Sequence, residues 1–180
     1  LTGEIQKWMA DSGLRGRVVW VLMTARIQNL SADIRRPGRA GDLIIPVLDP
    51  EGSERDEFIA WTVKGVLGEA VPANGSWQWK DLDEAMNGFS AADFSSLRLE
   101  LTAESGGRQM SLKEVLAVAQ DKLTADIAAA RKYQTLQALV NCTVKQLLPG
   151  GAKLTKAEAL QHKAKWTQEL REMEAAGLVS

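Results

Sequence analysis

Two arginines that stand three positions apart on a Pro-Gly turn are the residues of this chain best suited to chemistry. They are Arg36 and Arg39 in the run Arg36-Pro37-Gly38-Arg39. A guanidinium group is permanently charged, planar and forked, so two of them on a short rigid turn suit the equatorial oxygens of a transferring phosphoryl group. An apolar run ending in Thr24-Ala25-Arg26 precedes the pair. The pattern therefore points to phosphate chemistry.

Two apolar segments flank this pair and have the character of strands. Residues 18–24 are apolar almost without interruption and begin with β-branched residues, which is typical of a strand buried on both faces. Residues 43–47 form a second such segment, which the turn Asp49-Pro50-Glu51-Gly52 closes. Between the two segments, Ser31 can cap a short helix that Pro37 stops. The arginine turn is thus expected between two strands.

These residues resemble the AAA ATPase family. The runs from Val18 through Arg26, from Ser31 through Arg39 and from Leu43 through Pro46 resemble the second half of an AAA module, from the sensor-1 strand onward. The run Asn87-Gly88-Phe89-Ser90-Ala91-Ala92-Asp93-Phe94 resembles the motif that opens a helix in the AAA lid. Together the resemblance covers about residues 1–120.

The resemblance assigns the arginine pair a role between subunits. Arg36 and Arg39 would be arginine fingers that act in trans, each reaching the γ-phosphate of ATP held by a neighbouring subunit. The alternative is that Arg36 or Arg39 only forms a surface ion pair with Asp33 or Asp42, because such pairs are common and nearly neutral in energy.

The sensor-1 region, Thr24 and Ala25, departs from the family pattern. The family usually carries Asn, sometimes Thr, where this chain has Ala25, and a methyl group cannot order the attacking water. Alternate residues of a strand point to opposite faces, so Thr24 does not simply replace it. The expected consequence is slow hydrolysis, or a module in which nucleotide binding matters more than turnover.

The lid motif supplies the expected nucleotide-binding residues. Ser90, Ala91 and Ala92 match the small residues that approach the adenine and ribose in the family. No arginine stands at this helix start in the sensor-2 position, and Arg98 is two turns further on.

Two phosphate-binding features of a complete ATPase are absent from the sequence. There is no G-x-x-x-x-G-K-[ST] loop and no apolar strand ending in Asp-Glu. ATP and Mg²⁺ are therefore expected to serve the complete module, with neither bound by this chain alone. The parent protein is expected to be an ATPase and this chain by itself to be inactive.

The remainder of the chain reads as helices. Four start signals have the spacing of capping boxes: Ser53-x-x-Asp56, Ser90-x-x-Asp93, Ser111-x-x-Glu114 and Thr155-x-x-Glu158. A short amphipathic helix is expected before residue 11, because Ile5, Trp8 and Met9 form one stripe. The longer helices are expected at about 53–68, 80–87, 90–104, 111–148 with a break near Thr124, and 155–176.

The expected fold is mainly α with a small α/β remnant. By the resemblance, the remnant is two parallel-sheet strands of a P-loop AAA core, followed by a helical lid bundle and extra C-terminal helices. The expected domains are residues 1–51, the C-terminal part of the AAA α/β subdomain; residues 52–124, the helical lid; and residues 125–180, a C-terminal helical extension.

Several single residues are expected to have structural roles. Trp77 and Trp79 could form a stacking platform, but anchoring a loop onto the core is the favoured interpretation. Trp61 is expected in the core. Cys142 is expected to be a small buried hydrophobe and His162 a helix-surface residue.

Charge is unevenly distributed along the chain. Residues 1–40, 41–110 and 111–180 carry net charges of +4, −8 and +3. Such a pattern could steer copies of the chain into head-to-tail contact, although solvated faces also vary in charge without specifying a partner. No apolar run approaches a membrane span and no leader pattern opens the chain, so a cytoplasmic, intracellular protein is expected.

Three functions are compatible with these features. The first is part of a ring-forming AAA ATPase that remodels proteins, with self-association or the missing nucleotide-binding half as its partner. The second is a helical interaction module derived from such an ATPase, in which residues 111–180 dock a partner and the finger turn is vestigial. The third is a nucleic-acid-handling AAA+ protein. It is the weakest, because the basic residues cluster around the finger motif and do not follow a groove.

Overall fold

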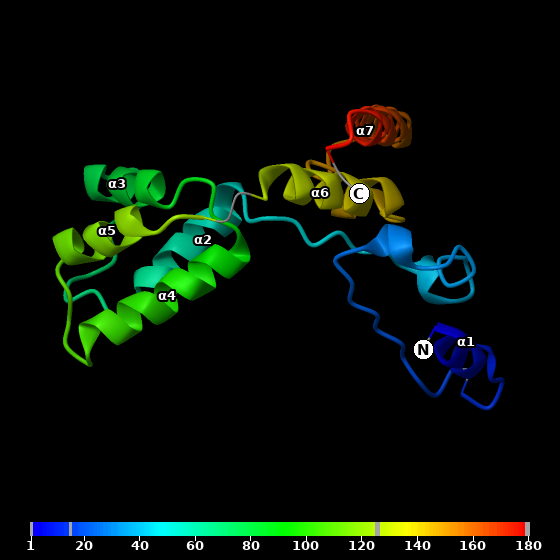
Figure 1. The fold of residues 1–180 in the computed structure, drawn as a ribbon, viewed down its shortest axis with the longest axis horizontal. Helices are drawn as coiled ribbons and strands as arrows, with labels where there is room; N and C mark the ends of the chain where they lie inside the picture. The colour runs from blue at the N-terminus through cyan, green and yellow to red at the C-terminus, as the bar shows by residue number, and fades with distance from the viewer. Residues whose placement is uncertain (1, 15, 125–126, 179–180) are drawn as a thin grey trace. The chain divides into compact units, whose positions relative to one another are not determined.

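The structure is a computed structural model that describes residues 2–14, 16–124 and 127–178, and these residues are mainly α-helical (Figure 1). The helices are α1 (Thr2–Ala10), α2 (Gly52–Val63), α3 (Trp77–Ala85), α4 (Ala91–Ser105), α5 (Leu112–Asp121), α6 (Ala128–Asn141) and α7 (Lys156–Ala175). Three short 3-10 helices, η1 (Ile27–Asn29), η2 (Ala40–Asp42) and η3 (Lys145–Leu147), complete the set.

The chain divides into two compact units. The unit made of Leu1–Val47 together with Ile127–Ser180 is called the arginine unit. The continuous segment Leu48–Asp126 is called the lid unit, after the lid that the sequence resemblance leads us to expect there. The domain boundary expected between residues 124 and 125 borders on residues 125 and 126, which lie outside the described residues. Each unit has its own set of packed helices.

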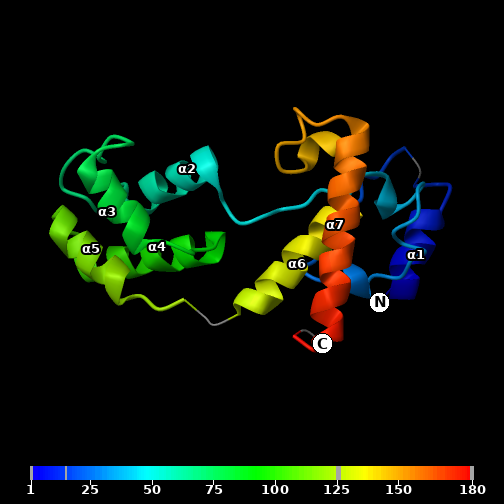
Figure 2. The same ribbon diagram turned by 90° about the horizontal axis from the view of Figure 1, so that it is seen from above.

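The lid unit is a group of four helices around one hydrophobic core. Helix α2 packs against α4, α3 packs against α5, and α4 also contacts α5 (Figure 2). The ring of Phe94 is fully buried, with its centroid 5.5 Å from those of Phe58 and Phe89. Burial of such large apolar side chains is the main stabilising term in folding. The other buried side chains of this core include Ile59, Val63, Leu82, Met86, Leu97, Leu101 and Val115.

Three of the four expected capping boxes are confirmed, and the fourth is wrong. The hydroxyls of Ser90, Ser111 and Thr155 each accept a hydrogen bond from the backbone N–H three residues later. The carboxylate of that later residue in turn accepts from the backbone N–H of the capping residue. Helix α2 instead begins at Gly52, before the expected cap at Ser53, and has no side-chain cap. The N-cap is Glu51, two residues before Ser53, and the first helical residue, Gly52, has a φ of +54°, which glycine adopts readily.

Two arginines satisfy carbonyl groups at the ends of neighbouring helices in the lid unit. Arg55 donates to the carbonyl oxygens of Asp83 and Met86, each at 2.9 Å. Arg98 donates to the carbonyl oxygens of Trp61 and Lys64, and its guanidinium carbon lies 4.6 Å from the centroid of the Trp61 ring. The expectation that Trp61 is a core residue is therefore wrong, because this ring is 42% exposed and faces Arg98 from the surface.

The two neighbouring tryptophans of α3 have different surroundings. Trp79 is 6% exposed and belongs to the core, whereas Trp77 at the first helical position is 67% exposed. The N-cap is Ser76, whose hydroxyl accepts from the Trp79 N–H at 3.1 Å. Residues two apart on a helix do not share a face, so anchoring is confirmed for Trp79 and wrong for Trp77.

In the arginine unit, α6 and α7 form the main packed pair (Figure 2). Their contact buries Leu136 of α6 against Leu170 and Met173 of α7. The expected interruption near Thr124 is present, but α6 ends at Asn141 and not near residue 148. Cys142 is buried just beyond that end, and His162 is exposed on α7, as the sequence predicts.

The two segments expected as strands are extended but do not form a sheet in the described part of the chain. Residues 18–24 and 43–47 pair with no neighbouring strand in the described ranges, and most of their apolar side chains face solvent, with Ile44 and Pro46 partly buried. Val19, Met23 and Val47 are 89%, 93% and 90% exposed. A strand is stabilised by a ladder of backbone partners. The Ile44 carbonyl oxygen accepts one hydrogen bond from the Thr143 N–H at 3.4 Å, and the described residues form no ladder beside either segment. The described structure is therefore mainly α.

None of the helices in the described ranges combines the length and the apolar character that crossing a membrane requires.

Candidate functional site: an arginine turn

The arginine pair lies on a turn with the features of type II. Pro37 is its second residue and Gly38, with a φ of +82°, is its third. The turn closes through a hydrogen bond from the Arg39 N–H to the Arg36 carbonyl oxygen at 3.3 Å. The Gly38 N–H donates to Oδ1 of Asp42 at 2.8 Å. The backbone that carries both arginines is thus fixed by local bonds.

Gly41 allows the chain to pass close to this turn. A Cβ atom at Gly41 would lie 1.9 Å from the carbonyl oxygen of Arg35 and 2.8 Å from the carbonyl carbon of Arg36. No side chain fits at that distance from backbone atoms, so this position requires glycine. Nothing in the local sequence pattern distinguishes Gly41 from an ordinary loop glycine, and it was not predicted.

Both arginine side chains converge on Asp33. Arg36 pairs through Nη2 with Oδ1 of the carboxylate, and Arg39 pairs through Nη1 with Oδ2. The side chains of Arg36, Arg39 and Asp33 are 65%, 24% and 38% exposed. The ion pair expected as an alternative is therefore present for both arginines and involves Asp33, whereas Asp42 binds the turn backbone.

Residues at and just beyond the C-terminal end of α6 support the turn. Nε of Arg35 donates to the Leu30 carbonyl oxygen, and its Nη1 donates to Oδ1 of Asn141, both at 3.1 Å. The hydroxyl of Thr143 accepts from the Ile44 N–H at 2.9 Å and lies 3.4 Å from the Asp42 carbonyl oxygen. About a hundred positions separate these partners in sequence, so no local motif could have predicted Asn141 or Thr143 as parts of the site.

The two residues expected to form the sensor-1 region lie in a segment with a local hydrogen bond. Thr24 and Ala25 are exposed in the extended segment that precedes the turn. The Thr24 hydroxyl accepts from the Arg26 N–H at 3.0 Å, which bends the chain into η1. Helix η1 in turn packs against α6. The structure therefore places the Thr24 hydroxyl in a local turn.

The expected nucleotide-binding residues open α4 in the lid unit. The Ser90 hydroxyl donates to Oδ2 of Asp93 at 2.6 Å and accepts from the Asp93 N–H at 3.2 Å. Ala91 and Ala92 are the first two residues of the helix, and Ala92 is exposed. Ser90 is committed to capping, while the two alanines leave the helix start uncrowded. These residues and the arginine pair belong to different compact units.

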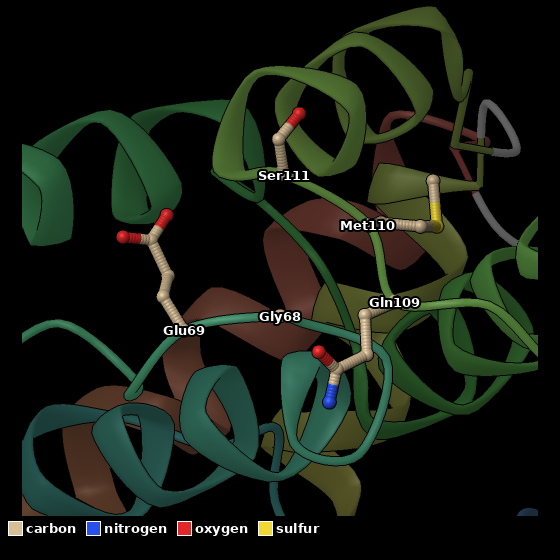
Figure 3. A pocket seen from close by; sticks show the side chains of 5 residues that line it. All are labelled: Gly68, Glu69, Gln109, Met110 and Ser111. Carbon is tan, nitrogen blue, oxygen red and sulfur yellow. The ribbon is translucent and has the colours of Figure 1, made fainter.

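A shallow hollow of about 300 Å³ lies elsewhere in the lid unit, lined by Gly68, Glu69, Gln109, Met110 and Ser111 (Figure 3). Two loops meet there: the Gly68 N–H donates to the Met110 carbonyl oxygen and the Met110 N–H to the Val66 carbonyl oxygen, both at 2.8 Å. None of the residues expected to act on a nucleotide lines this hollow.

The unit that carries the arginine turn is basic and the lid unit is acidic. Residues 48–126 hold 7 Lys and Arg against 15 Asp and Glu, a net charge of −8. The two segments of the arginine unit hold 15 against 8, a net charge of +7. A basic surround favours the approach of an anion to the arginine pair.

A metal-binding cluster is not present in the parts of the chain that the structure describes, where no three His, Cys, Asp or Glu side chains are grouped to hold an ion. Comparisons with protein-family models, curated proteins and solved structures found no match. The resemblance to AAA ATPases therefore rests on the residues of this chain.

Proposed function

We propose that this chain is the C-terminal portion of an AAA module in a ring-forming ATPase that remodels proteins. Arg36 and Arg39 serve as arginine fingers in trans, and the lid unit covers the nucleotide. The observation that carries this proposal is the convergence of two guanidinium groups, held on one rigid turn, on the two oxygens of a single anionic group, Asp33. Two forked donors so arranged suit a terminal phosphate.

The chemical role of the pair is electrostatic. In phosphoryl transfer, negative charge spreads over the equatorial oxygens of the γ-phosphoryl group, and fixed cations beside them lower the barrier. Arg39 is the more enclosed of the two and is oriented by the turn, whereas the exposed Arg36 can extend toward a neighbouring subunit. Neither supplies a proton acceptor, so the partner subunit must orient the attacking water.

The exposed extended segments support the finer part of this proposal. Residues 18–24 and 43–47 are the strands of an AAA core whose sheet is completed by a nucleotide-binding half. Most of their apolar side chains face solvent here, and pairing in a parallel sheet would bury them on both faces. ATP and Mg²⁺ are bound by the complete module, in which Ser90, Ala91 and Ala92 lie near the base and ribose.

The proposal is tested by mixing the chain with an AAA nucleotide-binding half that has a G-x-x-x-x-G-K-[ST] loop but no fingers of its own. Native chain should accelerate ATP hydrolysis by that half, and Arg39→Ala should not. If both associate equally and neither accelerates hydrolysis, the arginine turn has no role in trans, and a helical interaction module is the better description.

A further inference from the structure

Asp33 occupies the position that an external anion would take in the arginine pair. Its two carboxylate oxygens are each engaged by a different guanidinium group. Ser31 fixes the backbone on either side of Asp33: its hydroxyl accepts from the Ile34 N–H at 3.4 Å and from Nε2 of Gln6 at 3.0 Å. Ile34, the next residue, is 2% exposed and anchors the segment. The carboxylate is therefore presented to the arginines by a fixed backbone.

The charge of this group of three residues favours one class of ligand. Two guanidinium cations and one carboxylate leave a net charge of +1, and the carboxylate already satisfies the donors that face it. A ligand with a single negative charge would form the same hydrogen bonds with Arg36 and Arg39 that Asp33 already forms, so it gains nothing by displacing Asp33. A polyphosphate end carries more negative charge, and the Coulomb energy with two cations rises in proportion to that charge.

We propose that Asp33 is a specificity-determining residue: it fills the anion position between Arg36 and Arg39, so that the pair opens only to a multiply charged ligand such as the end of a polyphosphate. This proposal rests on the proposed function for its biological setting, but its test needs only this chain. A multiply charged ligand can displace Asp33, because partly exposed ion pairs contribute little net free energy.

The test is calorimetric titration of the full chain with inorganic tripolyphosphate. Asp33→Asn removes the competing charge and keeps the size of the side chain, so it should bind tripolyphosphate roughly two- to fivefold more tightly than the native chain. Asp33→Ala should change affinity in the same direction. A structural role for Asp33 would weaken binding on substitution, so a gain in affinity is specific to competition.

Three controls complete the test. Glu169→Gln makes the same change in net charge on α7, where Glu169 pairs with Lys132, and should leave the affinity near that of the native chain. Adding Arg39→Ala to Asp33→Asn should remove the gain. Acetate, compared with chloride at equal ionic strength, should weaken tripolyphosphate binding to Asp33→Asn, because it restores a carboxylate, and should not do so in the native chain.

The proposal is overturned if both folded Asp33 variants bind tripolyphosphate no more tightly than the native chain, or if Glu169→Gln gains as much. Circular dichroism of each variant establishes that it is folded. If only the proposed function is wrong, the Asp33 variants would still bind tripolyphosphate more tightly than the native chain, but the native chain would not stimulate ATP hydrolysis in trans.

Discussion

The two compact units differ in how far their apolar side chains are buried. In the lid unit, aromatic and aliphatic side chains from four helices fill one core, and Ser76, Ser90 and Ser111 cap three of those helices. In the arginine unit, two apolar segments are extended with their side chains in solvent, beside a turn held mainly by polar contacts. The lid unit encloses most of its large apolar side chains in one core, whereas the arginine unit leaves the apolar side chains of its extended segments exposed.

The largest expected effect is the loss of stability when a large side chain is removed from the core of the lid unit. Phe94→Ala should lower the free energy of unfolding of the lid unit by about 3–5 kcal/mol, because the ring is fully buried between two other rings. Urea unfolding followed by circular dichroism measures this loss. Leu99→Ala on the same helix, where the side chain is 72% exposed, should cost at most about 0.5 kcal/mol. Similar losses for the two variants would mean that the core is not packed as described.

Gly41→Ala should have the next largest effect, and it acts on the arginine unit. The added methyl group would meet the backbone of Arg35 and Arg36, so the turn must shift at a cost of about 1–3 kcal/mol. Thermal unfolding measures the cost, and tripolyphosphate affinity should fall with it. Gly3→Ala is the matched control: no atom lies within 4 Å of the position of its Cβ, and alanine favours the α1 helix. Equal thermal stability of Gly41→Ala and Gly3→Ala would contradict the close approach of the backbone at Gly41.

Thr143→Val tests the polar support of the turn. Loss of the hydroxyl leaves the Ile44 N–H without its 2.9 Å acceptor, at a cost of about 0.5–1.5 kcal/mol. Hydrogen exchange at the Ile44 amide should become faster. Thr167→Val removes a hydroxyl that bonds within α7, to the Lys163 carbonyl oxygen, and should leave exchange at Ile44 unchanged. An unchanged exchange rate at the Ile44 amide in Thr143→Val would contradict the hydrogen bond between Ile44 and Thr143.

The smallest effect concerns pH and the lid unit. The Ser111 N–H, followed by the Ser111 hydroxyl and Arg108, lowers the pKa of Glu114 from 4.5 to about 2. A carboxyl group whose pKa is lower in the folded state stabilises that state above pH 4.5, and the contribution is lost as pH falls toward 2.

Glu114→Gln should therefore reduce this part of the acid sensitivity. The measurement is the urea midpoint of each protein at pH of about 5 and about 2.5, within the range where the group titrates. The native midpoint should fall more than that of Glu114→Gln over this interval. An equal fall would show that the cap at Ser111 does not depend on the charge of Glu114.

Local signals in the sequence predicted much of the lid unit. Capping boxes at Ser90 and Ser111 and the apolar periodicity between them depend on residues three or four apart, which a helix brings together by itself. The failure at Trp61 has a different cause, because the side chain that faces it, Arg98, comes from another helix.

The arginine unit was less predictable for the same physical reason. Residues 18–24 were expected as a strand because they are apolar, but a strand also needs a neighbour, which composition does not reveal. The Arg36-Pro37-Gly38-Arg39 turn follows from local chemistry. Its supports, Gly41, Asn141 and Thr143, act through contacts between distant positions or through close backbone packing, which leave no local pattern.

The most direct test of the account is the single-turnover rate of γ-phosphate release by a finger-less AAA nucleotide-binding half, with each variant present at saturating concentration. Native chain should raise the rate strongly, since arginine fingers contribute on the order of 10³-fold or more. Arg36→Ala and Arg39→Ala should lose most of that gain, while Arg171→Ala, an exposed arginine of α7, should keep it. Equal rates for all four proteins, with equal association, would contradict the central claim that this turn supplies arginine fingers.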